Sequence, residues 1–315
     1  EWKGKNIFRT VYGRQHVLTL VNRWQPFLPL TICSPNSDKF ISPLESGEFA
    51  EIMTASAKRS QRIQIYLAFF MSVSFSLCNI FYPDPRFFVM CTVGILLLVY
   101  FSSEYFILFT GSNTLKDRAV TINEIFSSFR TPVTASFVFM IFIWVIQISL
   151  PADDPEEVFI NFGALYKSIG HGEYWRFLSG PYLHSGLAHW LSNLVFLIIA
   201  STVAAKISTF GALTAFIFGN LLGAIAAYLL NILSFTTGDV YVGISSGIYA
   251  LFSLTSALIV LSKSNFPIRF GYSLALFAIT SIAITALMFK SSAHGSHITG
   301  FLFGTLLGII WPKTN

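Results

Sequence analysis

Charge is what this sequence has least of. Only 11% of its 315 residues are charged, whereas soluble domains average about 25%. Hydrophobic residues make up 54% of the chain, and the mean hydropathy is +0.65. This composition excludes an ordinary soluble domain and predicts an integral membrane protein. The length is sufficient for roughly six to eight helical crossings of about 20 residues each.

Cysteine is also scarce, and the pattern excludes several classes of site. The three cysteines, Cys33, Cys78 and Cys91, have the spacing of neither a zinc site nor a disulfide framework. No His-Glu-x-x-His segment occurs, so we expect no metal. The net charge of +5 is typical of a membrane protein with Lys and Arg in its cytosolic loops. A nucleic-acid partner is therefore not expected.

The first 63 residues are polar, and we expect a small cytosolic segment there, serving as a solvated anchor or a docking module. Residues 16–24 could form a strand. The run Ser42-Pro43-Leu44-Glu45 has the residue order of a capped helix start, with Ser as N-cap, Pro first and Glu third. It predicts a helix that continues toward residues 58–62.

Two apolar runs follow, at 63–80 and 87–109. The residues between them, 82–86, contain two prolines, which indicates a tight turn. The pattern predicts a transmembrane hairpin over residues 64–111. Glu104 lies within its second helix, and we expect a structural residue whose carboxylate reaches the polar surface near the cytosolic end.

A polar linker is predicted at 112–130, and a six-helix core at 131–313. The expected crossings of the core are residues 132–150, 186–205, 210–232, 243–262, 268–289 and 294–312. The fold class is thus an all-α integral membrane protein with eight crossings. With the N-terminus in the cytosol, cytosolic segments hold sixteen of the 20 Lys and Arg residues and outer segments hold four. This asymmetry predicts that both termini are cytosolic.

The most polar residues of the core fall in the outer first turns of its second, fourth and sixth helices. They are His184, His189, Asn193, Ser245, His294 and His297. Since these helices all start at the outer face, the residues lie at similar depth. Imidazole and amide groups are costly to bury in an apolar bundle unless they are paired or used. The arrangement therefore predicts a site that opens to the outer side.

Ser245 and Tyr249 lie one helical turn apart on one face. Gly243 and Gly247 leave room beside them for a ligand or backbone. A serine needs a neighbouring base to act as a nucleophile. The candidate bases are His189, His294 and His297.

Glycines at 300, 304 and 308 follow His297 at four-residue intervals. This smooth face predicts that the sixth core helix packs closely on the fourth, bringing His297 within hydrogen-bond reach of Ser245. Each element alone is more often ordinary helix packing. Together they favour a reactive site.

His189 and Asn193 are four residues apart, so they share a helix face. An imidazole and a carboxamide are suitable donors for a developing oxyanion.

With these residues in place, the core resembles the rhomboid intramembrane serine proteases. The matching stretches are 173–177, His184 with His189 and Asn193, 243–246 with Tyr249 to Leu251, and 297–300.

The resemblance implies a serine–histidine dyad, with Ser245 as nucleophile and His297 as general base. It also implies supporting roles for other residues: an oxyanion hole from His189 and Asn193, an orienting ring from Tyr249, close packing at Gly243, a structural His184, and a loop brace from Trp175 and Arg176. Family members cleave membrane-anchored substrates in or beside a transmembrane helix, without metal or nucleotide. We therefore expect membrane-protein substrates, no cofactor and a bacterial inner membrane.

One departure leaves an alternative open. The family's Gly-x-Ser-Gly reads Gly243-Ile244-Ser245-Ser246 here, so Ser246 could be the nucleophile on motif grounds alone. The spacing to Gly243 and Tyr249 favours Ser245. Two other functions compete with proteolysis: a catalytically silent rhomboid-like protein that binds or escorts transmembrane helices, and a transporter or channel with a polar outer vestibule.

Overall fold

The computed structural model describes residues 2–6, 8–111, 113–152, 154–235, 238–288 and 293–313. The chain divides into two compact units, Glu1–Ser128 and Phe129–Asn315. We call them the N-terminal unit and the C-terminal unit and describe each by itself.

The N-terminal unit begins with a small antiparallel sheet and one helix. The central strand β1 (Lys3–Asn6) pairs with β2 (Thr10–Tyr12) on one side and β3 (Leu30–Cys33) on the other. Between β2 and β3 lies α1 (Arg14–Asn22). The expected strand at 16–24 is therefore wrong. Val17 and Val21, four residues apart, are both fully buried, and that period places them on one face of a helix.

The capping sequence at Ser42 starts only a single 3₁₀ turn, η1 (Pro43–Glu45). Both hydrogen bonds of the capping box are present, from Leu44 N to Ser42 Oγ and from Ser42 N to Glu45 Oε2. The long helix begins later, as α2 (Ala50–Phe81). It runs without a break through the expected cytosolic helix and the first crossing. Its 32 residues span about 48 Å, more than the roughly 30 Å of a bilayer's hydrocarbon core.

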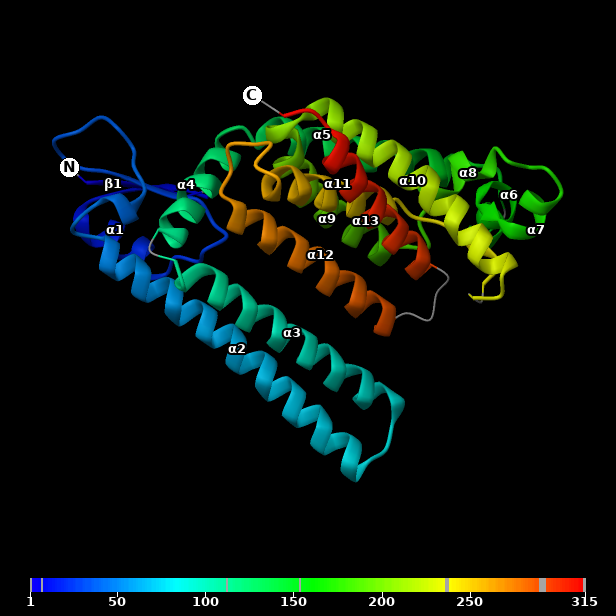
Figure 1. Cartoon of the computed structure of the whole chain (residues 1–315), viewed down its shortest axis with the longest axis horizontal. Coiled ribbons are helices and arrows are strands. Elements are labelled where there is room, and N and C mark those ends of the chain that lie inside the picture. Colours follow the sequence, from blue (N-terminus) through cyan, green and yellow to red (C-terminus); the bar gives the residue numbers. More distant parts are fainter. Residues whose placement is uncertain are drawn as a thin grey trace. The chain divides into compact units, whose positions relative to one another are not determined.

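The next helix packs along α2. Helix α3 (Pro85–Phe109) returns alongside α2 (Figure 1). Asp84 caps α3 by accepting from Arg86 N at 2.8 Å, and the Arg86 side chain lowers the pKa of the Asp84 carboxyl to about 2. At Gly94 the helices touch, because an added Cβ would lie 2.6 Å from Ser72 Oγ.

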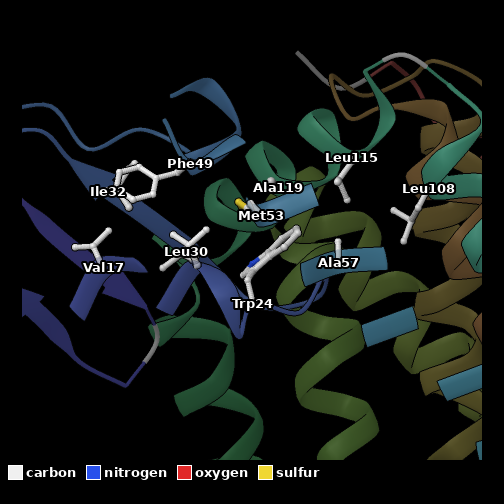
Figure 2. Close-up of a cluster of buried hydrophobic side chains, with 11 residues drawn as sticks. Val17, Trp24, Leu30, Ile32, Phe49, Met53, Ala57, Leu108, Leu115 and Ala119 are labelled. Carbon is white, nitrogen blue, oxygen red and sulfur yellow. The ribbon is translucent and has the colours of Figure 1, made fainter. Parts of the chain in front are cut away.

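The stretch expected to be a polar linker is mostly helical, as α4 (Thr114–Ser127). It contributes to the main hydrophobic core of the N-terminal unit (Figure 2). This core draws on α1, β3, the start of α2, the end of α3 and α4. Its buried members are Val17, Val21, Trp24, Leu30, Ile32, Phe49, Met53, Ala57, Leu108, Leu115 and Ala119. The sheet and the adjoining ends of the hairpin thus share one core.

Glu104 does not reach a polar surface, so that expectation is wrong. Its side chain is fully buried and forms an ion pair with Arg118 Nη1 of α4 at 2.8 Å. Arg118 is also buried, with 2% of its side chain exposed. A buried charge is retained at low cost only when it is paired, which explains why the cation comes from the stretch that looked like a linker.

The C-terminal unit contains the six expected core helices. They are α5 (Arg130–Ser149), α9 (Leu187–Ile207), α10 (Thr209–Ile232), α11 (Ser245–Val260), α12 (Ile268–Met288) and α13 (Ala293–Ile310). Within the described residues, six helices of the chain are long and apolar enough to cross a membrane: α2, α3, α5, α9, α10 and α12. The α11 helix is apolar but shorter. The predicted all-α membrane fold is confirmed.

Between α5 and α9 the chain forms a compact loop region. Its elements are α6 (Pro155–Phe162), β4 (Ala164–Leu165), α7 (Tyr166–Gly170), α8 (Arg176–Ser179) and the 3₁₀ turn η2 (Gly180–Tyr182). Strand β4 pairs antiparallel with β5 (Val240–Tyr241), just before α11. The loop region is therefore fixed to the segment that leads into α11.

Helix α11 is the buried centre of this unit, since every residue from Ser246 to Ile259 is buried. The glycine face of α13 packs on it: Gly300 against Ser246, Gly304 against Ala250 and Gly308 against Ala257. A Cβ at Gly308 would lie only 2.6 Å from the Cβ of Ala257. The predicted close approach of these two helices is confirmed (Figure 1).

The buried ion pair gives a test of the N-terminal unit. Arg118→Met leaves the Glu104 carboxylate buried without its partner, which we expect to lower the free energy of unfolding by about 3–5 kcal/mol. The double variant Glu104→Leu/Arg118→Met removes both charges and should recover most of that loss. Reversible unfolding of the purified full chain in detergent measures both values. Equal losses in the single and double variants would contradict this account.

Candidate active site

The site begins at the turn that leads into α11. Gly243 has φ +109°, a left-handed conformation that favours glycine, and Ser245 is the first helical residue. No side chain of the local sequence caps the helix at Ile244. Instead Asn220 of α10 accepts a hydrogen bond from Gly247 N at 2.8 Å, satisfying one of the free N–H groups of the first turn. A neighbouring helix therefore fixes the start of α11.

Ser245 and His297 meet across the α11–α13 contact. The Ser245 Oγ and His297 Nε2 atoms lie 2.7 Å apart, although the residues are 52 positions apart in sequence. Ser245 is half-buried and His297 is buried. In the described part of the chain, His297 Nδ1 has no hydrogen-bond partner. A hydroxyl and an imidazole at this distance can exchange a proton directly.

Tyr249 packs beside the imidazole. Its ring centroid lies 4.9 Å from that of His297, with the planes tilted by 49°. Its hydroxyl oxygen lies 2.9 Å from Ser281 Oγ of α12. Tyr249, one turn of α11 beyond Ser245, is thus positioned by a ring contact with His297 and by a hydrogen bond between its hydroxyl and Ser281.

Ser246 is engaged elsewhere. Its side chain is fully buried, and its hydroxyl donates to Ser296 O at 2.6 Å. It packs between Gly223 of α10 and Gly300 of α13. The two adjacent serines therefore face different groups: the hydroxyl of Ser245 lies against an imidazole nitrogen, and the hydroxyl of Ser246 lies against a backbone carbonyl.

His189 and Asn193 of α9 both approach the turn before Ser245. A Cβ at Gly243 would lie 2.8 Å from His189 Nε2 and 3.6 Å from Asn193 Nδ2. Gly243 thus makes room for these side chains, as Gly247 makes room for Asn220 and α10. Among the described residues, Asn193 Nδ2 is buried without a hydrogen-bond partner.

The hydrogen bonding of His189 selects its tautomer. Ser185 N donates to His189 Nδ1 at 3.4 Å, and Ser185 Oγ lies 3.1 Å from the same atom. A nitrogen that accepts a backbone N–H carries no proton, so in the neutral ring the proton is on Nε2. His189 and Asn193 therefore both present N–H donors near Gly243.

His184 packs beside His189. It is fully buried, and its ring centroid lies 5.2 Å from that of His189. The side-chain amide of Gln147 on α5 forms two hydrogen bonds with the His184 backbone. The His184 N–H donates to Gln147 Oε1, and Gln147 Nε2 donates to the His184 carbonyl oxygen, each at 2.8 Å. Sequence reasoning missed Gln147, whose only signal was a single amide in an apolar run.

Trp175 and Arg176 lie in the loop region, and their contacts are structural. Arg176 is buried, and its Nη1 donates to Ile160 O and Gly163 O, both at 2.9 Å. Its Nε donates to Glu173 Oε2 at 2.7 Å, and the guanidinium lies 4.8 Å from the Trp175 ring centroid. One cation thus holds the end of α6 and the start of α8 together.

The role of His294 as a base and the presence of a metal-binding group can also be compared with the structure. His294, a candidate base, lies in the first turn of α13, and within the described structure Ser245 forms its hydrogen bond with His297 instead. In the part of the chain that the structure describes, no group of three or more His, Cys, Asp or Glu side chains could hold a metal ion.

Comparison with known proteins gives a consistent result. Residues 171–313 match the model of the Rhomboid domain, a region that includes Ser245 and His297 but not Gln147, Ile160 or Gly163. One curated protein, Rhomboid-related protein 1 of Caenorhabditis elegans, is 27% identical over an alignment of 150 residues, and the match covers 44% of this chain. The chain spans 40% of the length of that relative. Both matches support the rhomboid family, and the domain match does not extend to the hairpin or the residues before it.

The clamp on His184 can be tested independently of activity. Gln147→Leu leaves the His184 N–H and C=O buried without partners, and each such group costs about 1–3 kcal/mol. We expect lower thermal stability and faster hydrogen exchange at the His184 amide. Ser149→Ala, an exposed change on the same helix, is the matched control and should leave both unchanged. Unaltered exchange at His184 in Gln147→Leu would show that the clamp does not hold this peptide.

Proposed function

We propose that this protein is an intramembrane serine endopeptidase of the rhomboid type. It would hydrolyse a peptide bond in or next to the transmembrane helix of a membrane-anchored substrate. The observation that carries the proposal is the 2.7 Å approach of Ser245 Oγ to His297 Nε2, within the segment that matches the Rhomboid domain.

In the proposed reaction, Ser245 Oγ attacks the carbonyl carbon of the scissile bond while His297 Nε2 takes its proton. The tetrahedral intermediate then collapses. The C–N bond breaks, and His297 returns the proton to the leaving amine. An ester on Ser245 remains. A water molecule, deprotonated by His297, hydrolyses that ester and releases a carboxylic acid, which restores the serine.

The oxyanion of the tetrahedral intermediate needs donors beside Ser245. We assign this role to His189 Nε2–H and Asn193 Nδ2–H, which both approach Gly243. Support comes from the tautomer that Ser185 selects in His189 and from the buried, unpartnered Asn193 amide in the described structure. Backbone N–H groups of the first turn of α11 would add further donors.

A third group normally orients the base of a serine nucleophile. No carboxylate forms a recorded hydrogen bond with His297 Nδ1 in the described residues. We propose that Tyr249 orients the imidazole by packing against it, with its own position fixed by Ser281. The protein would then use a dyad with an aromatic support.

The choice between the two serines follows from their partners. Ser246 donates its hydroxyl proton to a backbone carbonyl, and a carbonyl oxygen cannot act as a general base for the reaction. It is also fully buried, whereas Ser245 is half-buried. We therefore assign the nucleophile to Ser245 and a packing role to Ser246.

The membrane setting is part of the proposal. Both termini would lie in the cytosol, with the site open to the outer side, as the distribution of Lys and Arg indicates. The bacterial inner membrane remains a prediction, and the matched relative is an animal protein. Substrate helices must unwind to expose their backbone to Ser245, so helix-weak residues are expected near the cut. The boundaries 1–63, 64–111, 112–130 and 131–313 also remain predictions.

Cleavage of a reporter transmembrane substrate by the full chain in liposomes tests the proposal. We expect Ser245→Ala and His297→Ala each to lower the rate at least about a thousandfold, while Ser246→Ala retains activity. Size-exclusion and melting profiles establish that the variants are folded. Loss in Ser246→Ala with activity in Ser245→Ala would reverse the assignment. No cleavage of any reporter by the wild-type chain would favour the catalytically silent helix-binding protein.

A second set of variants addresses the oxyanion donors. Asn193→Ala should reduce kcat by about 10²–10³ with little change in KM, because the lost hydrogen bond strengthens only in the transition state. Ser192→Ala, an exposed neighbour on α9, serves as control and should retain the wild-type kcat. A rise in KM at constant kcat in Asn193→Ala would indicate a role in substrate binding instead.

A further inference from the structure

One exposed face of α2, in the N-terminal unit, carries a shallow groove. Its lining residues are Ala55, Lys58, Arg59, Arg62, Ile63 and Tyr66. They recur at intervals of one, three and four positions, which places them along one helix face. The opposite face, with Met53, Ala57 and Gln61, is buried in the unit. The groove therefore combines three cations with an apolar end.

The cations of the groove are not committed to carboxylates. Among the residues that the structure describes, ion pairs are recorded for Arg14, Arg86, Lys116, Arg118 and Arg176, and none for Lys58, Arg59 or Arg62. Glu51 lies in an adjoining groove toward the start of the helix. Lys58 is half-buried, and its Nζ lies 5.7 Å from the ring centroid of Phe109. This packing restricts the conformations that the Lys58 side chain can adopt.

The position of this groove along α2 relates it to the bilayer. From Ile63 to Phe81 the helix contains no charged residue, and this stretch is about 28 Å long at 1.5 Å per residue. That length matches the roughly 30 Å of hydrocarbon in a bilayer. Arg62 therefore marks the polar boundary. The three cations lie at the level of lipid headgroups, and Ile63 and Tyr66 lie at the start of the hydrocarbon.

We propose that this groove binds an anionic phospholipid. Lys58, Arg59 and Arg62 would contact its phosphate and headgroup, since juxtamembrane basic clusters attract anionic lipid. Ile63 and Tyr66 would flank the first part of an acyl chain, and tyrosine is favoured at that depth. The site lies in the N-terminal unit and does not depend on the proposed proteolysis.

The apolar end of the groove identifies lipid as the occupant. A water-soluble phosphate or an acidic peptide would use the cations and leave the Ile63 and Tyr66 end unused. An anionic lipid matches both ends of the groove. Its charged headgroup joins its acyl chain at the surface of the hydrocarbon layer, which is where the cations of the groove give way to Ile63 and Tyr66. The half-buried Lys58 is the best-placed of the three to hold a phosphate oxygen, because its side chain has less freedom to lose on binding.

The test compares the binding of two lipids with identical acyl chains to the purified 315-residue protein in detergent. Dioleoylphosphatidylglycerol and dioleoylphosphatidylcholine are titrated, and bound lipid is counted by native mass spectrometry. Each basic residue near an anionic surface contributes roughly a fivefold gain in affinity. We expect the wild-type chain to prefer the anionic lipid at least about tenfold. The triple variant Lys58→Gln/Arg59→Gln/Arg62→Gln should lose that preference.

A matched control removes the same charge elsewhere. Lys3→Gln/Lys5→Gln/Arg9→Gln changes three exposed cations of the same unit and should keep the wild-type preference. Equal loss in both triple variants would mean a general charge effect and would overturn the site. So would displacement of the lipid by millimolar inorganic phosphate, because the occupant would then be a free anion. If the groove triple does not fold, the exposed single variants Arg59→Gln and Arg62→Gln should each still weaken the preference severalfold, and wild-type binding in both would contradict the proposal.

Discussion

The close approach of α13 to α11 is the constraint on which the candidate site depends. Gly300, Gly304 and Gly308 each lie where a side chain would collide with α11. Glycine at these positions lets the two backbones approach more closely than larger residues allow. His297 lies one turn before the first of these glycines, so the same contact sets the distance between its imidazole and Ser245. Any residue that separates the helices also separates Ser245 from His297.

A second consequence of this packing concerns the start of α11. The helix is buried on all sides, so its first N–H groups cannot rely on water. Asn220 provides one acceptor from α10, and Gly243 turns the chain so that Ser245 is the first helical residue. The side chains of α9 then approach the same turn. Four helices therefore determine the surroundings of one hydroxyl, which is how an apolar bundle can hold several polar groups in fixed positions.

The features that the sequence predicted best are those marked by residues that recur every few positions along the chain. The apolar runs of the core gave helix boundaries within a few residues, and the four-residue glycine spacing predicted which helices would touch. The 3₁₀ turn at Ser42 shows the limit, because a capping box satisfies the first turn but does not determine where the next helix begins. At 16–24 the sequence pattern indicates a strand where the structure has helix α1, because the burial of this helix depends on a sheet formed by residues on both sides of it.

Polar partners distant in the sequence could not be predicted. Glu104 pairs with Arg118, which the sequence placed in a solvated linker. Gln147 and Asn220 each appear as one amide in an apolar run, and nothing local shows that one clamps the His184 peptide while the other caps α11. Ser246 is similar: its motif position matches that of a nucleophile's neighbour, but only the fold shows that its hydroxyl is bound to Ser296 O.

The central claim is that packing on α11 gives Ser245, and not Ser246, an activated hydroxyl. Covalent labelling with a fluorophosphonate, followed by peptide mapping of the adduct, tests it most directly. A fluorophosphonate reacts with a serine that a neighbouring base activates, and it does so without any knowledge of the natural substrate. The account predicts a single adduct on Ser245 that disappears in His297→Ala. An adduct on Ser246, or labelling of Ser245 that persists without His297, would contradict it.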